Sequence, residues 1–264
     1  MDLVNSIILG AIQGATEFIP VSSSGHLILA RDLLNMEVNY GLAFDAVLQL
    51  ATTFAVLVYF RKDILNIVKN FFKFVLRKRI DANELILLKA VIFGTIPAVV
   101  IGFFIEDFMD TVFRSSALVA LTLIIGGLIM FWAEKFSKKN LDLNVKKGVG
   151  IGFFQALALV PGFSRSGMTI SGGLFLGLKR EVATRFSFLL AFPVLLGAGL
   201  KKFLDLGSAG VLNSVGLELF IGSLTSFVVG LLAIHFLVTF LRKNTMNIFV
   251  YYRFILALIV LIFV

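Results

Sequence analysis

Six long apolar runs dominate this chain of 264 residues. They cover residues 41–60, 84–104, 116–133, 181–200, 217–241 and 246–264. A transmembrane helix needs about 20 consecutive apolar residues, so each run can cross a bilayer. The composition agrees, because 59% of the residues are hydrophobic and 15% are charged, whereas a soluble domain has about 25% charged residues. The runs therefore predict an all-α integral membrane protein in which residues 1–264 form a single membrane domain.

The basic residues between these runs are unevenly distributed, and this predicts the topology. One set of segments holds seventeen Lys and Arg residues, and the other holds four. The basic set comprises residues 61–83, 134–148, 179–185 and 242–243. Lysine and arginine accumulate on the cytoplasmic side of membrane proteins, so we expect this set to be cytoplasmic and in contact with anionic lipid. Topology thus explains the net charge of +8, and we expect no nucleic-acid partner because no recognition fold is apparent.

The same charge pattern predicts two re-entrant hairpins. For the spans to place every basic segment on one side, residues 1–34 must begin and end outside, and residues 148–178 must begin and end inside. Each hairpin should consist of a short helix, a non-helical turn and a second short helix. Pro20 and Pro161 are expected to end the first helix of each, because proline disfavours helix at the residue before it.

A polar motif recurs in these two segments at an offset of 142 residues. The matching pairs are Gln13 and Gln155, Ser22 and Ser164, Ser24 and Ser166, and Gly25 and Gly167. Each half of the chain, about 1–137 and 138–264, would hold one hairpin and three transmembrane helices. Because three is an odd number, the two repeats would be inverted, an arrangement in which broken helices meet near the membrane midplane.

The predicted hairpin tips carry groups suited to an anion. Serines at a helix start cap free N–H groups, and those N–H groups attract phosphate. Arg165 adds a forked donor for phosphate oxygens. Glu17, His26 and Arg165 are costly in lipid, which favours a functional role. The alternative is that the serines only cap helices and that Arg165 only pairs with Glu17.

Four stretches of the chain resemble the bacterial undecaprenyl-diphosphate phosphatase family, also known as bacitracin-resistance proteins. They are residues 13–26, ending in FIPVSSSGH, residues 161–169, which read PGFSRSGMT, and the shorter stretches 44–50 and 252–253. The resemblance implies hydrolysis of undecaprenyl diphosphate to its monophosphate and inorganic phosphate. This reaction recycles the lipid carrier of peptidoglycan synthesis in the bacterial cytoplasmic membrane, and it confers bacitracin resistance.

Four residues are expected to be catalytic, namely Glu17, Ser23, His26 and Arg165. Ser23 or a water molecule would attack phosphorus, and His26 would act as base or as leaving-group acid. Glu17 would orient His26, act as base or bind a metal ion. The expected substrate contacts are Gln13, Ser22, Ser24, Gly25, Ser164, Ser166, Thr169 and Arg253. The alternative for Arg253 is a structural ion pair.

A divalent cation, Mg²⁺ or Ca²⁺, is expected to bridge Glu17 and the substrate, because the motifs hold too few carboxylates for a site built by protein alone. The expected partners are undecaprenyl diphosphate and membrane lipid, and a homodimer is left open. The charge pattern favours a site open to the extracytoplasmic side. Two other functions are considered: a lipid transporter or flippase, and a type-2 phosphatidic-acid phosphatase, which the sparse histidines disfavour.

Overall fold

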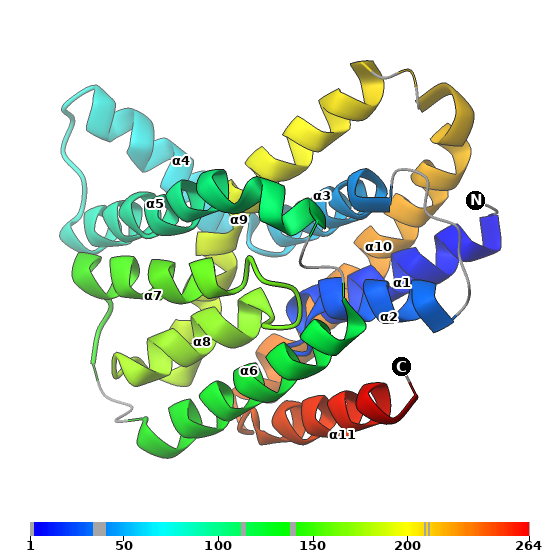
Figure 1. Cartoon of the computed structure of the whole chain (residues 1–264). Coiled ribbons are helices and arrows are strands. Elements are labelled where there is room, and N and C mark those ends of the chain that lie inside the picture. Colours follow the sequence, from blue (N-terminus) through cyan, green and yellow to red (C-terminus); the bar gives the residue numbers. More distant parts are fainter. Residues whose placement is uncertain are drawn as a thin grey trace.

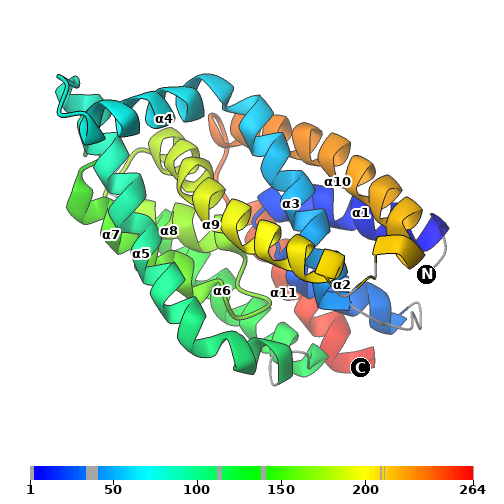
Figure 2. The same cartoon turned by 90° about the horizontal axis from the view of Figure 1, so that it is seen from above.

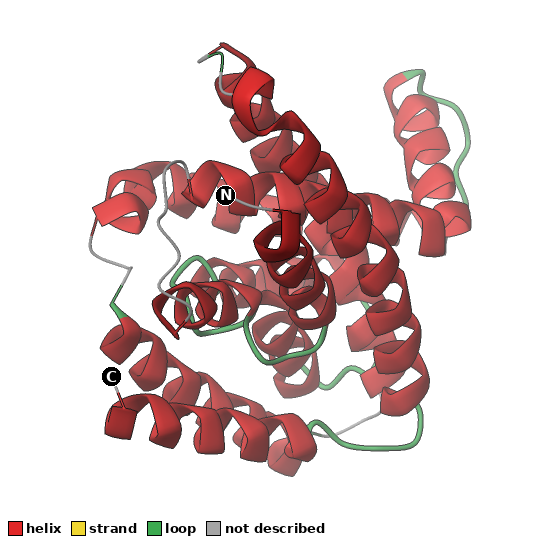
Figure 3. Cartoon of the chain, turned by 90° about the vertical axis from the view of Figure 1, so that its right-hand side faces the viewer, coloured by secondary structure: helices red, strands yellow, loops and turns green. Residues whose placement is uncertain are grey.

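The computed structural model describes residues 3–33, 41–111, 115–137, 141–208, 210 and 212–263. In this part of the chain the secondary structure is eleven helices, with a single isolated bridge between Leu141 and Leu178 (Figure 3). The helices are α1 (Leu3–Phe18), α2 (Ser23–Leu33), α3 (Gly41–Tyr59), α4 (Arg61–Val75), α5 (Ala82–Thr111), α6 (Ser116–Phe136), α7 (Val145–Leu157), α8 (Arg165–Phe175), α9 (Arg180–Ser208), α10 (Leu212–Leu241) and α11 (Asn247–Phe263).

The six apolar runs fall on α3, α5, α6, α9, α10 and α11. Within the described ranges, four helices are long and apolar enough to cross a membrane on their own, namely α5, α6, α9 and α10. Helices α3 and α4 together form a fifth candidate, broken by a bend of 88°, and α11 is a shorter apolar helix. The prediction of an all-α, multi-pass membrane protein is therefore confirmed.

Both predicted hairpins are present. Helix α1 ends two residues before Pro20, and α7 ends four residues before Pro161, so each proline lies in the turn that follows. The two hairpins enter the molecule from opposite ends, and their tips meet between the long helices (Figure 1). The chain ends lie at one end of the molecule, and α4 lies at the other (Figure 2). The basic segments meet at the end that holds α4, because Asp63 pairs with Arg185, and Glu134 pairs with Arg180 and accepts the N–H of Met246.

Each hairpin is held by a long helix from the other half of the chain. Helix α1 packs on α10, and α7 packs on α5. A Cβ added to Gly10 would lie 2.3 Å from the carbonyl oxygen of Gly222, and one added to Gly152 would lie 2.1 Å from that of Gly94. Only glycine permits such a close approach of two helix backbones. Neither hairpin can therefore be positioned by its own half alone.

The basic segment 61–83 differs from the simple connection expected between spans. Its first part is the helix α4, which turns sharply away from α3. Asn66 and Asn70 donate hydrogen bonds to the Glu84 carboxylate of α5, both at 2.8 Å. Helix α4 is thus anchored to the bundle by a polar contact rather than left as a loose loop.

Candidate active site

The centre of the site is the carboxylate of Glu17, in the last turn of α1. It is only 4% exposed. Its Oε2 accepts hydrogen bonds from Gln13 Nε2 at 2.9 Å and from Ser23 Oγ at 2.6 Å, and Gln49 Nε2 of α3 lies 3.4 Å away. Its Oε1 accepts from Arg165 Nη2 at 2.7 Å, across the interface between the hairpins. The carboxylate therefore joins both tips and holds the Ser23 hydroxyl in the geometry of a base beside a nucleophile.

Arg165, the first residue of α8, is only partly satisfied by this ion pair. Its Nε and Nη1 are buried and have no hydrogen-bond partner among the described residues. Buried donors without partners cost about 1–3 kcal/mol each, so a native protein rarely leaves them without a reason. A guanidinium is a strong donor to phosphate oxygens, and two nitrogens of this one are left for a ligand. The alternative that Arg165 only pairs with Glu17 leaves these two nitrogens unexplained.

The turns of the two hairpins differ in length but end in the same serine cap. Ser22 and Ser164 both adopt left-handed conformations, with φ of 77° and 69°. In each turn the serine Oγ accepts a hydrogen bond from the backbone N–H three residues later, at 3.3 Å in both cases. Non-glycine residues pay about 1–2 kcal/mol for this conformation. The same strained cap at both tips indicates that the surroundings impose it.

The cap changes the expected role of two serines. Ser22 Oγ accepts a second N–H, from Gly162 of the opposite turn, at 3.1 Å. The hydroxyls of Ser22 and Ser164 also lie 3.3 and 3.2 Å from those of Ser24 and Ser166. The sequence predicts all four serines as substrate contacts. In the structure Ser22 and Ser164 cap the two helices, as the alternative interpretation of the sequence predicts. Contact of the four serines with substrate stays a prediction.

His26 is held by residues other than Glu17. Its Nδ1 lies 2.7 Å from the carbonyl oxygen of Ser22, and its Nε2 lies 2.8 Å from the hydroxyl of Tyr252. A carbonyl only accepts, so Nδ1 carries a proton, and in the neutral imidazole Nε2 accepts from Tyr252. The two rings stack at 5.7 Å with an interplanar angle of 8°. The expectation that Glu17 orients His26 is wrong, because Ser22 and Tyr252 do so.

Arg253 ties several backbone segments together, and its expected role as a substrate contact stays a prediction. Its side chain is completely buried in α11. Its three nitrogens donate to five backbone carbonyls, at 2.8 to 3.4 Å, those of Pro20, Thr122, Leu123, Gly162 and Phe163. Gly126 of α6 leaves the space for the guanidinium, because a Cβ there would lie 2.2 Å from Nη2. Arg253 therefore fastens both hairpin turns to α6 through backbone carbonyls, and not through the ion pair that was the expected alternative.

Thr169 also differs from its predicted role. Its Oγ1 lies 2.7 Å from the Arg165 carbonyl oxygen and 2.5 Å from the Ser187 hydroxyl of α9. The residue is fully buried. These bonds secure the first turn of α8 against α9, so Thr169 supports the position of Arg165 rather than contacting a ligand.

Comparison with known proteins identifies the family. A family model described as "Bacitracin resistance protein BacA" matches residues 6–259. The chain belongs to this family. It is 42% identical to the undecaprenyl-diphosphatase of Rubrobacter xylanophilus over 98% of this chain and 97% of the relative. It is 42% identical to that of Elusimicrobium minutum, over 99% and 98%, and 43% identical to that of Corynebacterium glutamicum, over 98% and 89%.

Two glutamines of this BacA-family chain, Gln49 and Gln155, were not predicted to contact substrate. Gln49 approaches Glu17 from α3, and the only sequence signal for it is its place in the family-like stretch 44–50. Gln155 occupies the position in α7 that Gln13 has in α1. Both polar atoms of its side chain are buried without a partner in the described part of the chain. Tyr252 belongs to the stretch 252–253 that resembles the family, but no sequence pattern predicted its place beside His26.

The side chains at the tips suit a metal ion only if a ligand completes the site. Among the described residues no group of three or more His, Asp, Glu or Cys side chains is placed to hold a metal. Glu17 offers one carboxylate. Gln13 and Gln49 donate to it through their amide nitrogens, and their amide oxygens would face an ion once the amides turn over. Mg²⁺ is commonly bound through one or two carboxylates together with substrate phosphates. The donors therefore fit a cation shared with a diphosphate.

Proposed function

We propose that this protein is an undecaprenyl-diphosphatase of the cytoplasmic membrane. It hydrolyses the polyprenyl diphosphate carrier to the monophosphate and inorganic phosphate, recycles the carrier for peptidoglycan synthesis and confers bacitracin resistance. The observation that carries the proposal is the buried Glu17 carboxylate, which accepts from the Ser23 hydroxyl and pairs with an Arg165 that keeps two donors free. Full-length similarity to several undecaprenyl-diphosphatases supports the same reaction.

In the first step the terminal phosphate binds the donors of Arg165 that Glu17 leaves free. Glu17 removes the proton from Ser23 Oγ, which attacks the terminal phosphorus. A Ser23 O–P bond forms and the P–O bond of the anhydride breaks, so that the lipid monophosphate leaves with the electron pair. Charge develops on the equatorial oxygens, where fixed donors such as Arg165 stabilise it.

In the second step a water molecule attacks the phosphoserine. The bond to Ser23 breaks, Glu17 returns its proton to the serine oxygen, and inorganic phosphate leaves with both water hydrogens. The 2.6 Å contact between Ser23 and Glu17 favours this serine over water as the first nucleophile. His26, held by Ser22 and Tyr252, keeps the first turn in place and faces the leaving lipid phosphate.

Glu17, with Gln13 and Gln49, would hold Mg²⁺ or Ca²⁺ together with the substrate phosphates. The ion would neutralise phosphate charge. Chelator is therefore expected to reduce turnover and to weaken diphosphate binding measured by calorimetry. Equal affinity and equal turnover with and without chelator would contradict a role for the cation.

The test of the function is phosphate release from a polyprenyl diphosphate by the purified protein in detergent. We expect steady release by the natural protein and by Glu181→Gln, whose side chain is exposed at the start of α9. Glu17→Gln should release almost none. Absence of release by folded natural protein that still binds the lipid would overturn the proposal. It would favour a lipid transporter, for which the two hairpins entering from opposite ends are the supporting feature.

We also propose that the two halves are inverted repeats and that the site opens to the extracytoplasmic side. The repeat is supported by the matched caps of Ser22 and Ser164, and by the equivalent glycine contacts of α1 on α10 and α7 on α5. The orientation is supported by the basic segments, which gather at the end away from the termini. Since the chain has no cysteine, Leu3→Cys and Lys78→Cys can be labelled singly with a membrane-impermeant thiol reagent. If only the Lys78→Cys variant were labelled in intact cells, the orientation would be the opposite of the one proposed.

A further inference from the structure

Helix α4 presents a large apolar face that no described residue covers. Leu65, Phe72, Val75 and Leu76 are each about 60% exposed, at a spacing that places them on one side of a helix. The opposite side carries the asparagines that bind Glu84, so the orientation of α4 is fixed. Exposed apolar patches of this kind mark contact with membrane or with another protein.

The bend between α3 and α4 and the charge of this region favour membrane. If α3 crosses the bilayer, a bend of 88° places α4 along its surface. Residues 61–79 contain seven Lys and Arg residues and one acidic residue, Asp63. Asp63 already forms an ion pair with Arg185. A helix with an apolar face and an excess of basic residues is typical of binding in the plane of an anionic membrane surface.

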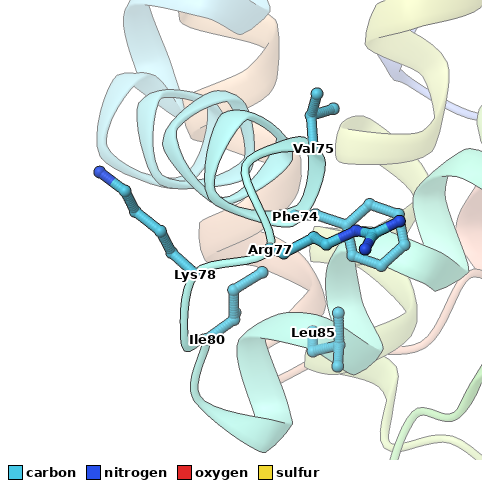
Figure 4. Close-up of a pocket in the computed structure, with 6 residues that line it drawn as sticks. All are labelled: Phe74, Val75, Arg77, Lys78, Ile80 and Leu85. Carbon is cyan, nitrogen blue, oxygen red and sulfur yellow. The ribbon is translucent and has the colours of Figure 1, made fainter.

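A cavity of about 520 Å³ lies at the C-terminal end of α4, where the chain turns into α5 (Figure 4). Its walls combine apolar and basic side chains, namely Phe74, Val75, Arg77, Lys78, Ile80 and Leu85. Arg77 and Lys78 extend in different directions from the turn (Figure 4). The cavity therefore offers a cationic edge next to apolar walls, which are the two features that a phospholipid presents in complementary form.

The turn at this cavity is made by a strained arginine. Arg77 has a φ of 52°, and the N–H of Lys78 donates to the carbonyl of Lys73 at 2.8 Å, which closes a Schellman-type helix end. Glycine is the residue that such a position normally favours. An arginine at this position lowers the stability of the folded chain. We therefore expect its guanidinium to bind a ligand or a partner.

We propose that α4 is an interfacial helix that binds anionic phospholipid, with one headgroup phosphate held by Arg77 at the cavity and the acyl chain lying on its apolar walls. The lipid belongs to the leaflet at the basic end of the molecule. This site is separate from the hairpin tips, so the proposal does not depend on the phosphatase reaction.

The position of α4 can be measured with a single indole. The chain has one tryptophan, Trp132, so a Trp132→Phe, Phe72→Trp variant reports on α4 alone. It is reconstituted in phosphatidylcholine with brominated phosphatidylglycerol or with brominated phosphatidylcholine. We expect quenching by both lipids, and stronger quenching by the anionic one. Absence of quenching would overturn the interfacial helix, and a concentration-dependent dimer abolished by Phe72→Asp would assign the face to a second copy instead.

The headgroup site is tested by titrating the detergent-solubilised protein with phosphatidylglycerol and counting bound lipids by native mass spectrometry. Arg77→Gly removes the charge but keeps a residue suited to the turn, so it should fold at least as well as the natural chain. We expect its lipid affinity to fall about fivefold, which corresponds to the roughly 1 kcal/mol that one basic residue contributes near an anionic surface. The control is Arg242→Gln, an exposed arginine at the same end. Equal loss in both variants would overturn the specific site, and phosphatidylcholine binding as tight as phosphatidylglycerol would overturn the charge selectivity.

Discussion

The two hairpin turns share a helix cap but differ in length and in chemistry. Both turns place a serine at positive φ, and both use that serine as a helix cap. The first hairpin carries Glu17 and His26, whereas the equivalent positions in the second, 142 residues later, are Leu159 and Met168. The second hairpin instead carries Arg165 at the position of Ser23. In the proposed reaction, the first hairpin supplies the nucleophile and the base, and the second supplies the phosphate-binding cation.

The largest effect should come from the cation of the second hairpin. Arg165→Lys keeps a charge near Glu17 but removes the forked donors that are free in the structure. We expect phosphate release to fall about 10³-fold, the upper range for loss of one transition-state donor. The control is Arg185→Lys, an exposed ion-pair residue that should retain activity. Nearly normal turnover by Arg165→Lys would show that charge alone is sufficient.

The imidazole of the first hairpin should have the next largest effect. His26→Gln should lower turnover less than Arg165→Lys does, because His26 holds the first turn through Ser22 and Tyr252 and does not contact Ser23. The comparison is Met168→Leu at the equivalent position of the second hairpin, which should leave turnover unchanged. If Met168→Leu were as damaging as His26→Gln, the division of chemistry between the hairpins would be wrong.

Arg253 holds both turns and should affect them together. Arg253→Lys has too few donors for five carbonyls, so we expect a lower melting temperature, corresponding to about 2 kcal/mol, because buried acceptors lose their partners. Turnover should fall about tenfold with KM nearly unchanged, since all three nitrogens of Arg253 are bonded to backbone carbonyls. A large rise in KM with normal kcat would instead make Arg253 a substrate contact.

The smallest effects test whether the two turns are equivalent. At both Ser22 and Ser164, alanine keeps the backbone strain and loses the cap, which costs about 1 kcal/mol. Glycine loses the cap but relieves the strain, so its effect should be close to zero. Melting temperatures should therefore rank glycine near serine and above alanine at both positions. A different ranking at the two turns would contradict the equivalence of the two serine caps.

Much of the fold was predictable because its signals are local. Apolar runs predict the long helices, and two prolines together with the charge pattern predict the hairpins. Helix α4 was missed because its apolar face is interrupted by lysines and reads as a basic connection. Its pairing with α5 depends on Glu84, a contact that only the folded chain makes.

The site was predictable in its residue types but not in its pairings. Glu17 meets both Ser23 and Arg165, and of these two contacts only the pairing with Arg165 was named from the sequence. The contact of His26 with Tyr252 links residues 226 positions apart. No rule based on sequence spacing predicts such a contact. Arg253 has the same limitation, because its partners are backbone carbonyls, which carry no sequence signature.

The central claim is that Glu17 and Arg165 act as one unit across the two hairpins. Its most direct test is a double-mutant cycle of phosphate release with Glu17→Gln, Arg165→Gln and the combined variant. Residues that act together lose little more in combination than in the more damaging single variant. We predict that result, with all three variants folded and inserted. If the two losses instead multiply in the combined variant, Glu17 and Arg165 contribute independently, and the joint site is contradicted.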